Sequence, residues 1–502
     1  MTAPAPVPGA PTPGPAAETE WLRLDPRTIP ATTAVVAGAL AAAAVPVAIG
    51  MLLSGLAVGW VLLWTIGGTV LGAGATAVSE TIRLAVTTYR VDAHRIDRRV
   101  RFLASTTTSL STGRVRNVEI SADLVQRRLG IATVKLASGE TGGSRLTFAA
   151  LDREVADDLR RHLLAGRSGT DSSEVVRLDP AWVRYAPASV MTPLFGLAGI
   201  GIVFQVADWF GAAPEVLQWI WDRIGEWPIP VIAAGVVSLA LVMGTIASVA
   251  MFIENWWGLR LDHHDDGSLE LRRGLLVGRH TSFDGRRVRG VTLHEPPGFR
   301  ALGAARLDVV ASGVGTGKDE DGKQKQSPPL VPASPREVPA GVAEAVLGEP
   351  APTRFRAHPP AARRRRIVRA VAVVVVVTGF GAVPAAIWPW LWWVPLLAAA
   401  LAGAVGLWAA LDNSRGLGHA VTGGVVALRK GSLMRRTDVL DRDGILGWNL
   451  RRTPFQRRAG LVTLVATAAG GGGAFRLPDV GLEQAPELWR TAGPVWDHLA
   501  GA

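Results

Sequence analysis

The residues from Ala31 to Ser79 carry no charged side chain, and this stretch constrains the fold more than any other feature of the chain. A helix needs roughly 20 apolar residues to cross ~30 Å of hydrocarbon, so the stretch is long enough for two spans. The two helices would meet near Gly50–Gly55. A cleavable signal peptide has a much shorter apolar core, of ~7–15 residues. The stretch therefore predicts a helical hairpin in a membrane.

Two further apolar blocks have the same character. The second extends from Ala186 to Ala207 and resumes from Pro228 to Ile253, and the acidic, tryptophan-rich stretch Asp208–Trp227 separates its two parts. The third extends from Ile367 to Leu411 and is interrupted by four tryptophans between Trp388 and Trp393. Tryptophan gathers at the water–lipid interface. We predict six spans in three hairpins. A buried core helix in a soluble protein is the alternative, but it suits isolated runs of ~10–14 residues.

Basic residues stand at the outer ends of all three hairpins. They are Arg23, Arg27, Arg83, Arg90, Arg177, Arg184, Arg260, Arg363, Arg364, Arg365, Arg366, Arg369 and Arg415. The longest connection inside a hairpin instead holds Asp208, Glu215, Asp222 and Glu226 against Arg223 alone. Because basic residues near span ends stay in the cytoplasm, we predict a multi-pass plasma-membrane protein with both termini cytoplasmic. For the run Arg363–Arg366, a role in topology and solubility is favoured over lipid binding.

Three segments of the chain repeat one pattern. They are Gln126-Arg127-Arg128-Leu129-Gly130, Phe299-Arg300-Ala301-Leu302-Gly303 and Gln456-Arg457-Arg458-Ala459-Gly460. Val115, Val288 and Ile445 stand 15 residues before the last glycine of each segment, and Arg101, Gly274 and Gly431 stand 14 residues earlier still. An Arg-x-x-Pro sequence precedes each hairpin, at Arg23, Arg177 and Arg356. These constant spacings predict three copies of one unit, each made of a hairpin and a soluble domain.

The soluble segments have the sequence pattern of antiparallel β-strands separated by turns. Short runs of alternating apolar and polar residues are separated by Gly, Asp, Ser and Asn, which is typical of strands and turns. Each segment ends in a predicted helix, at Leu151–Leu164, Pro335–Leu347 and Leu482–Leu499. Leu151, Val155, Leu159 and Leu163 share one face of the first, so we expect that helix to cover the open end of a curved sheet.

The Arg-x-x-Pro sequence, the hairpin, the patch Val115-Arg116-Asn117-Val118 and the Gln-Arg-Arg-x-Gly turn together carry a resemblance. The chain resembles the membrane-flanked bacterial pleckstrin-homology-like (PH-like) domain proteins, in a three-copy form, from about Arg23 to its end. The resemblance implies a small antiparallel β-barrel or sandwich with a C-terminal helix in each copy, and it implies little about activity. The middle copy has Phe299-Arg300-Ala301 in place of Gln-Arg-Arg, and the third has Ile445-Leu446-Gly447-Trp448 in place of Val-Arg-x-Val. We therefore expect a role that rests on one of these arginines only in the copies that have it.

The predicted fold class is a multi-pass α-helical membrane protein with three small antiparallel β, PH-like domains, each capped by a C-terminal helix. The predicted boundaries are a disordered tail at 1–22, hairpins at 23–80, 186–254 and 367–411, and domains at 81–166, 255–349 and 412–502. We expect linkers at 167–185 and 350–366, the second of them basic, and a polar loop at 312–333 within the second domain.

Composition and motifs exclude several kinds of chemistry. The chain has no cysteine, so thiolate catalysis and cysteine metal sites are excluded. The run Gly313–Lys318 resembles a P-loop but has Ser312 and Asp319 where the motif needs Gly and Ser or Thr. His263-His264-Asp265-Asp266 is interpreted as a polar turn rather than a metal site, because adjacent strand residues face opposite ways. We therefore predict no enzyme, no cofactor and no metal.

The net charge of +11 fits contact with anionic lipid, nucleic acid or neither, since basic residues also set topology. Nucleic-acid binding is disfavoured because the basic stretches lack interleaved aromatic residues. The candidate lipid- or partner-facing basic patch consists of Arg116, Arg127, Arg128, Arg287, Arg289, Arg457 and Arg458. A purely structural role for these arginines is equally compatible with the sequence.

The leading functional hypothesis is a membrane scaffold whose cytoplasmic domains bind protein partners or inner-leaflet lipids. The alternative is a component of a transport, export or envelope-stress resistance system. Ion-coupled transport is disfavoured because the residues 31–79, 228–250 and 371–411 contain no charged side chain.

Overall fold

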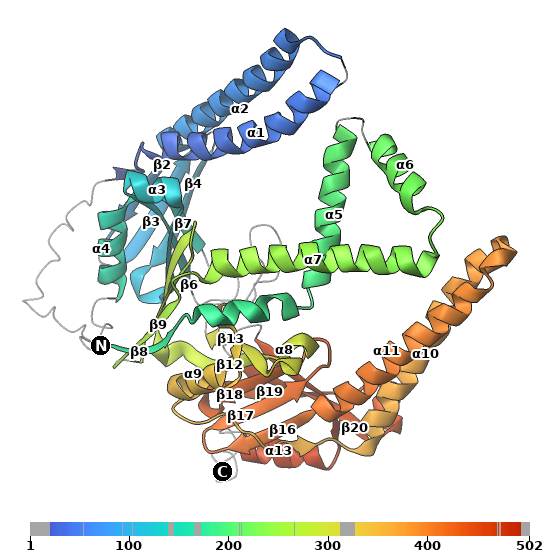
Figure 1. Cartoon of the computed structure of the whole chain (residues 1–502). Helices are drawn as coiled ribbons and strands as arrows, with labels where there is room; N and C mark the ends of the chain where they lie inside the picture. The colour runs from blue at the N-terminus through green and yellow to red at the C-terminus, as the bar shows by residue number, and fades with distance from the viewer. Residues whose placement is uncertain are drawn as a thin grey trace, which may run out of the picture.

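The computed structural model describes residues 21–492, with gaps at 139–144, 165–171 and 312–326 and at positions 54, 93, 103, 210, 212, 266, 469, 471 and 472. Nearly all of the predicted disordered tail and the whole run Gly313–Lys318 lie outside the described residues. One order of elements occurs three times along the described chain (Figure 1). We refer to these segments as unit 1 (22–164), unit 2 (172–347) and unit 3 (356–492).

The units have the following elements. Unit 1 contains β1 (Leu22–Arg23), α1 (Thr28–Leu53), α2 (Val58–Val86), β2 (Thr87–Val91), β3 (Arg95–Arg101), β4 (Ser105–Ser111), η1 (Thr112–Arg114), β5 (Val115–Ala122), α3 (Leu124–Leu129), β6 (Ile131–Ser138), β7 (Arg145–Asp152) and α4 (Arg153–Leu164). Unit 2 contains β8 (Ser172–Arg177), η2 (Pro180–Ala188), α5 (Thr192–Trp209), α6 (Ala213–Ile224), α7 (Ile229–Trp256), β9 (Arg260–His264), β10 (Leu269–Arg273), β11 (Gly278–Phe283), η3 (Gly285–Arg287), β12 (Val288–His294), α8 (Pro297–Ala301), β13 (Ala304–Ala311), β14 (Pro329–Pro335) and α9 (Glu337–Leu347). Unit 3 contains β15 (Arg356–Ala357), α10 (Pro360–Ile387), η4 (Pro389–Leu391), α11 (Trp393–Gly416), β16 (Gly418–Thr422), β17 (Val425–Lys430), β18 (Arg436–Asp441), η5 (Arg442–Gly444), β19 (Ile445–Arg451), α12 (Pro454–Arg458), β20 (Leu461–Ala468), β21 (Ala474–Gly481) and α13 (Gln484–Ala492).

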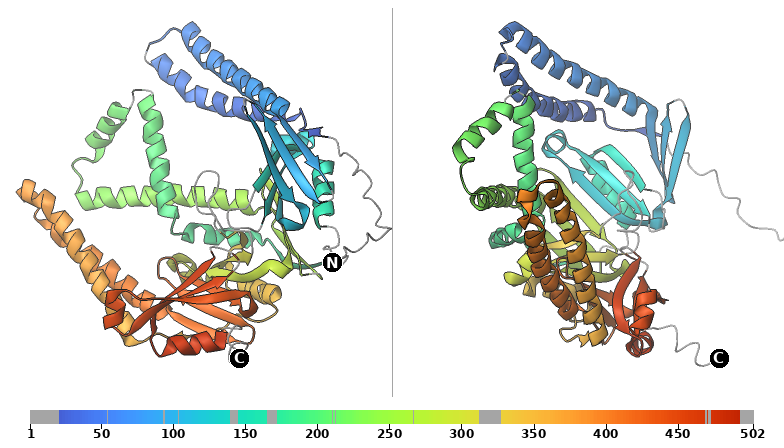
Figure 2. Two further views of the ribbon diagram at one scale, coloured as in Figure 1. Left: turned by 180° about the vertical axis from the view of Figure 1, so that it is seen from behind. Right: turned by 90° about the vertical axis from the view of Figure 1, so that its right-hand side faces the viewer.

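Six of the described helices are long and apolar enough to cross a membrane, as the sequence predicts. They form the pairs α1–α2, α5–α7 and α10–α11. Their side chains are apolar all round and mostly exposed, which suits a lipid environment rather than an aqueous one. The three pairs project from the same side of the β-strands (Figures 1 and 2), and α1 of the first pair also contacts α5 of the second.

The second and third hairpins differ from the predicted boundaries. The second was predicted from residue 186, but residues 180–188 form a 3-10 helix containing Pro187, and α5 begins at Thr192. Proline removes a backbone donor and so interrupts α-helical hydrogen bonding. The acidic connection holds a further helix, α6. The last part of the predicted basic linker, residues 360–366, is helical, because α10 begins at Pro360 and includes Arg363–Arg366. Proline is favoured at the first position of a helix.

Strands also occupy parts of both predicted linkers and of the predicted polar loop. β8 pairs with β9 and β15 pairs with β16, so the segment before each hairpin joins the sheet that follows the hairpin. β14 begins at Pro329, inside the predicted loop 312–333. β15 has only two residues, β14 contains proline, and the sequence of β8, SSEVVR, does not alternate, so period-2 alternation gave little signal for these strands.

The repeated Gln-Arg-Arg-x-Gly turn is a short capped helix. In α3 the side chain of Asp123 accepts from the backbone N–H of Gln126, and the Gln126 side chain accepts from the backbone N–H of Asp123. Thr453 and Gln456 make the same capping box at α12. Gly130 ends α3 with a φ of 72°, a left-handed conformation that favours glycine. The sequence pattern thus encodes a helix start and stop.

Each unit contributes two groups of strands, and at each junction one group of a unit pairs with one group of the next unit. β5, β6 and β7 of unit 1 form a single seven-stranded sheet with β8–β11 of unit 2, joined where β5 pairs with β11. β12, β13 and β14 of unit 2 likewise form a seven-stranded sheet with β15–β18 of unit 3, joined where β12 pairs with β18. The two remaining sheets, β1–β4 and β19–β21, lie at the ends of this series.

The apolar cores follow this arrangement. In unit 1, Phe148, Ile96 and Leu136 are fully buried between the two groups of strands, and Leu159 of the closing helix α4 packs on them. The core of unit 2 extends across the junction to Val439 of unit 3, and Val310 of unit 2 belongs to the core of unit 3. Units 2 and 3 therefore share both a sheet and a core, whereas unit 1 shares a sheet with unit 2 but has a core of its own.

Candidate anion-binding cavities at the unit junctions

The seven arginines of the predicted basic patch do not form one surface. Arg128, Arg457 and Arg458 are exposed on the short helices α3 and α12. Arg287 instead pairs with Asp284 at an Nε–Oδ2 distance of 2.7 Å, and Arg289 lies 3.8 Å from Asp441 of unit 3. Arg116 lies on β5, and its side chain is outside the described part of the structure.

Arg127 connects unit 1 to unit 2. Its Nη2 lies 2.5 Å from the carbonyl oxygen of Leu275 and 2.6 Å from that of Leu276, in the turn between β10 and β11. Arg300, at the same place in unit 2, reaches across to unit 3 and donates to Asp412 at 2.9 Å. The first arginine of this turn is thus a contact between successive units, a role that repeat spacing alone could not predict.

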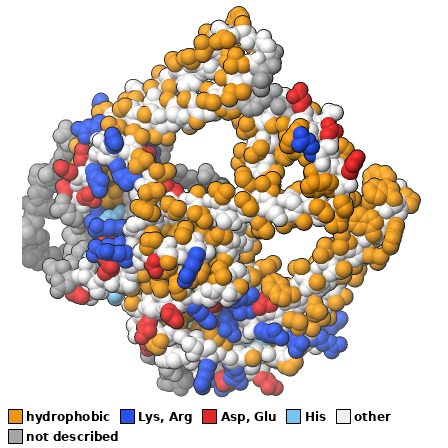
Figure 3. Space-filling model, in the orientation of Figure 1, with side chains coloured by type: hydrophobic (Ala, Val, Ile, Leu, Met, Phe, Trp, Pro, Cys, Tyr) orange, Lys and Arg blue, Asp and Glu red, His pale blue; other side chains and the backbone are white. Residues whose placement is uncertain are grey.

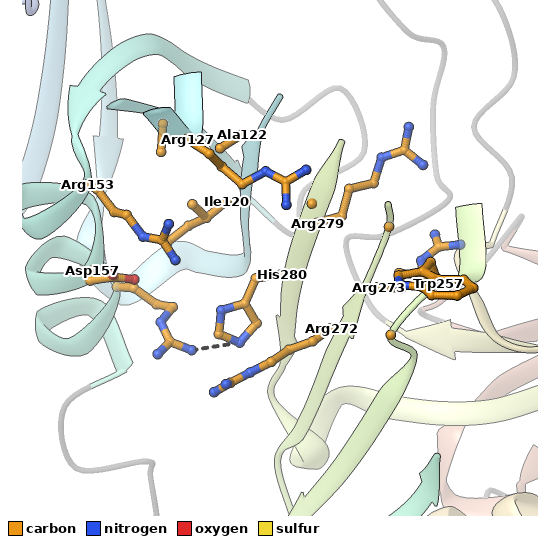
Figure 4. A pocket seen from close by; sticks show the side chains of 15 residues that line it. Ile120, Ala122, Arg127, Arg153, Asp157, Trp257, Arg272, Arg273, Arg279 and His280 are labelled. Atoms are coloured by element: carbon orange, nitrogen blue, oxygen red, sulfur yellow. Dashed lines mark hydrogen bonds between the residues drawn. The ribbon is translucent and has the colours of Figure 1, made fainter. Parts of the chain in front are cut away.

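A cavity of about 460 Å³ lies at the junction between units 1 and 2, beside the end of α7 (Figure 4). The residues around it come from β5, α3 and α4 of unit 1 and from β10 and β11 of unit 2. Its charged and aromatic lining consists of Arg127, Arg153, Asp157, Arg160, Trp257, Arg272, Arg273, Arg279 and His280. One carboxylate against six guanidinium groups makes the cavity strongly basic.

Two of these arginines are neutralised by a carboxylate beside the cavity. Glu270 accepts from Arg160 at 2.7 Å and from Arg272 at 3.0 Å, and it also contacts His280. The hydrogen bond from His280, together with the two arginines, holds the pKa of Glu270 far below its ordinary value despite burial. Burial lowers the pKa of His280, so its imidazole is neutral at pH 7.

Four other arginines of this cavity have no carboxylate partner among the described residues. The partners that the structure gives Arg127 and Arg279 are neutral: backbone carbonyls for Arg127 and the Asn255 side chain at 3.1 Å for Arg279. Arg273 stacks on the Trp256 ring at 4.5 Å, and burial lowers its pKa to about 10. Arg153 is exposed at the edge of the cavity. Guanidinium groups arranged around a cavity favour a phosphate or carboxylate ligand.

A second cavity, of about 770 Å³, lies at the junction between units 2 and 3. Its lining combines arginines with apolar residues, two of which, Val190 and Met191, immediately precede α5. The lining includes Val190, Met191, Phe299, Met434, Arg306, Arg435, Arg436 and Arg476, with His294 and Asp308. Asp308 accepts two bonds of 2.8 Å from Arg306. Three of the four arginines pair with carboxylates, so this cavity is less positive than the first.

Most of these cavity residues were not predicted from the sequence. Arg153 and Arg160 belong to the helix that closes unit 1, whereas Arg272, Arg273 and Arg279 belong to strands of unit 2. No local motif connects them, because the pairing of β5 with β11 brings them together. Of these residues, only Arg127 was among the predicted site residues, because it belongs to the repeated Gln-Arg-Arg-x-Gly segment.

The remaining predictions for sites have mixed outcomes. His263 and His264 lie on strand β9 rather than in a turn, and His264 contacts Glu270 at 3.2 Å. Among the described residues no group of three or more His, Asp or Glu side chains could hold a metal. Arg365 and Arg366 of the basic run pair with the buried carboxylate of Asp479, so they anchor α10 to strand β21.

The fold and these cavities define a class: a multi-pass helical membrane protein whose hairpins carry small antiparallel β-domains joined edge to edge. Residues 33–167 and 360–494 match the family described as Bacterial PH domain. The two segments make up more than half of the chain, so the chain belongs to the bacterial PH domain family. They fall on units 1 and 3, so the family is found in two copies rather than the three predicted. No curated protein and no solved structure matches the chain.

Proposed function

We propose that this protein is a membrane scaffold whose β-domains hold anionic lipid head groups of the inner leaflet in the junction cavities. The observation that carries the proposal is the arginine-lined cavity beside the end of α7, four of whose guanidinium groups lack a carboxylate partner among the described residues. A basic group near an anionic surface contributes ~1 kcal/mol of attraction. No catalytic role is proposed.

The proposal places both termini and all three units in the cytoplasm. Lysine and arginine gather over the β-domains, whereas the hairpins are mostly apolar and the tip of the second hairpin is acidic (Figure 3). This distribution supports a cytoplasmic side for the β-domains, because basic residues near span ends are retained there. We also propose that unit 2 is a third PH-like domain, since its order of elements matches that of units 1 and 3.

A role in transport gains less support. A transport path would require the six helices to enclose a channel or cavity, but the three pairs do not pack side by side as one bundle in Figures 1 and 2. Each apolar helix contacts mainly the other helix of its own hairpin. Binding of protein partners instead of lipid is an outcome of the experiment below.

The lipid proposal predicts a difference between anionic and neutral lipids. The intact protein, purified in a neutral detergent, should show a higher midpoint of thermal unfolding with added phosphatidylglycerol than with phosphatidylcholine. A ligand at 100 times its Kd stabilises the folded state by ~2.7 kcal/mol. The variant Arg153→Gln/Arg279→Gln should lose most of the difference. The matched control Arg128→Gln/Arg458→Gln removes two exposed arginines that do not line this cavity and should keep the difference.

Equal midpoints with the two lipids in the wild-type protein would contradict lipid binding and leave the protein-partner form of the scaffold. A difference that survives in Arg153→Gln/Arg279→Gln would show that the first cavity is not the lipid site.

A further inference from the structure

The two ends of the series of units present unpaired strand edges. β4 of unit 1 pairs with β3 on one side, and no other described strand pairs with its second side. β19 of unit 3 similarly pairs only with β20 among the described strands. β4 has the sequence STTTSLS, without charge or proline. Proteins usually protect exposed edges with charges, proline or bulges, so an unprotected edge of seven residues indicates a binding surface.

The internal junctions show what such edges bind. β4 occupies in unit 1 the place of β11 in unit 2 and β18 in unit 3, and β19 occupies in unit 3 the place of β5 and β12. In the first junction Phe283 pairs with Asn117, and in the second Leu440 pairs with Gly290. The spacing of the repeat makes these two pairs equivalent, so both junctions have the same register. Applied to the free edges, this register pairs Leu110 with Gly447, Thr108 with Asn449 and Thr107 with Leu450.

Side chains on β4 and β19 are more exposed than their equivalents on the strands of the internal junctions, as expected if a pairing strand is missing. Leu450 of β19 is 42% exposed, whereas its equivalents Ile120 and Leu293, on strands paired with a following unit, are 9% and 7% exposed. Ser109 of β4 is exposed, whereas its equivalent Ser282 in β11 is buried. The outer edges therefore have the side-chain positions of a junction without its partner.

The arginine between units follows the same pattern. Arg127 and Arg300 each reach from the short helix to the following unit. Arg457 is their equivalent in unit 3, where the described chain supplies no following unit, and it is exposed. Phe455, two residues before it, is 72% exposed.

We propose that a second copy of this chain completes both edges: β19 of one copy pairs antiparallel with β4 of the next, in the register of the internal junctions. The association is head to tail, because the two edges differ from each other. Such a heterologous contact closes into a ring or continues as an open array, depending on the rotation between copies. This proposal is independent of lipid binding, since no cavity residue takes part in the β4–β19 contact.

Cysteine cross-linking tests the register directly, because the chain has no cysteine of its own. The full-length variants Thr108→Cys/Asn449→Cys and Thr107→Cys/Leu450→Cys are oxidised in native membranes and run on non-reducing gels. Directly opposed residues alternate between wide and narrow pairs, so at least one variant should give disulfide-linked dimers and larger multimers. A mixture of the single variants Thr108→Cys and Asn449→Cys should stop at the dimer. The control Thr108→Cys/Leu446→Cys, three residues out of register, should cross-link much less.

A charge pair on the same two strands gives a second test that does not depend on oxidation. Leu450→Lys should reduce the mass of the purified protein, measured by light scattering, from a multimer to a single chain. Adding Thr107→Glu in the same chain should restore the multimer, because Thr107 opposes Leu450 across the proposed contact.

Three outcomes would overturn the proposal. They are a monomeric wild-type protein that does not cross-link in the membrane, equal cross-linking by the out-of-register control, and efficient dimers from Thr108→Cys alone. The last would show β4 pairing with β4 in a symmetric dimer.

Discussion

Adjacent arginines on α3 serve different purposes because the helix turns one toward the next unit and the other toward solvent. Arg127 donates to two carbonyl oxygens of the β10–β11 turn, whereas Arg128 is exposed. Hydrogen bonds to a charged group contribute ~1.5–3 kcal/mol, while an exposed cation contributes little unless a ligand meets it. The contribution of each arginine to stability therefore depends on its contacts with the neighbouring unit rather than on its place in the motif.

A matched pair of substitutions separates the two roles. Arg127→Gln should lower the free energy of unfolding of the intact protein by about 2 kcal/mol, because two carbonyl oxygens lose a charged donor. Arg128→Gln should change it by less than about 0.5 kcal/mol. Chemical unfolding followed by tryptophan fluorescence measures both. Similar losses in the two variants would contradict the assignment of Arg127 to the junction.

Two histidines at the base of the third hairpin are held neutral. His358 and His419 have ring centroids 5.7 Å apart, and neither ring nitrogen of His358 has a hydrogen-bond partner among the described residues. Burial lowers the pKa of each to about 4. Protonation of His419 would oppose protonation of His358, and the charges of Arg366 at His358 and of Arg356 at His419 lower the pKa values further. Asp479 and Glu487 act in the opposite direction.

These pKa values predict loss of stability in acid. The unfolded histidines bind protons below about pH 6.5, whereas the folded ones stay neutral until about pH 4. Stability from this pair is therefore full above about pH 6.5 and falls as the pH drops toward 4, by at most about 3 kcal/mol per histidine. Unfolding of the wild type should depend more steeply on pH in this window than unfolding of His358→Leu/His419→Leu. Parallel curves would contradict the prediction.

At the scale of elements, the second hairpin is packed more closely than the first. A Cβ atom on Gly196 of α5 would lie 1.7 Å from the carbonyl oxygen of Ala240 in α7, and one on Gly244 would lie 2.0 Å from that of Thr192. Thr192 and Ser248 also share a buried hydrogen bond of 2.9 Å between their hydroxyl groups. Small residues of this kind allow membrane helices to approach closely and to hydrogen-bond across the contact.

This close contact predicts that the second hairpin tolerates an added methyl group less well than the first hairpin. Gly196→Ala should lower the midpoint of thermal unfolding by several degrees, because overpacking costs ~1–3 kcal/mol. Gly67→Ala in α2 is the matched control, since a Cβ there has no atom within 4 Å and should be tolerated. The prediction fails if the two variants melt together. In the first hairpin, a Cβ atom on Gly72 would meet the Leu40 side chain, whereas one on Gly68 or Gly74 would have no atom within 4 Å.

Elements with a strong local signal were predictable, and pairings between distant elements were not. The apolar blocks specified six membrane helices because a span of ~20 apolar residues has few alternatives. The closing helices α4 and α9 begin within two residues of their predicted starts. The pairing of β5 with β11 leaves no local trace, because any strand of suitable alternation offers the same backbone groups. The cavity lined by Arg160 and Arg279 depends on that pairing and was therefore missed.

At the scale of the whole molecule, the chain is a series of shared sheets rather than a set of separate domains. Each internal junction combines continuous strand pairing with an arginine contact and, between units 2 and 3, a common core. A substitution at one junction is therefore expected to affect the stability of both units that form the junction. An excised single unit would expose edges that the full chain covers, so the intact protein is the correct object for binding experiments.

The shared sheets also govern how the protein is made. The strand β5 ends at Ala122 and its partner β11 begins at Gly278, about 150 residues later. At a synthesis rate of ~5–20 residues per second, β5 leaves the ribosome roughly 10–30 seconds before its partner exists. During that interval the second hairpin has to enter the membrane, because it lies between the two strands in the chain. Membrane insertion of each hairpin thus precedes closure of the sheet behind it, and a delay in insertion would leave the nascent chain with an open edge available to chaperones or to aggregation.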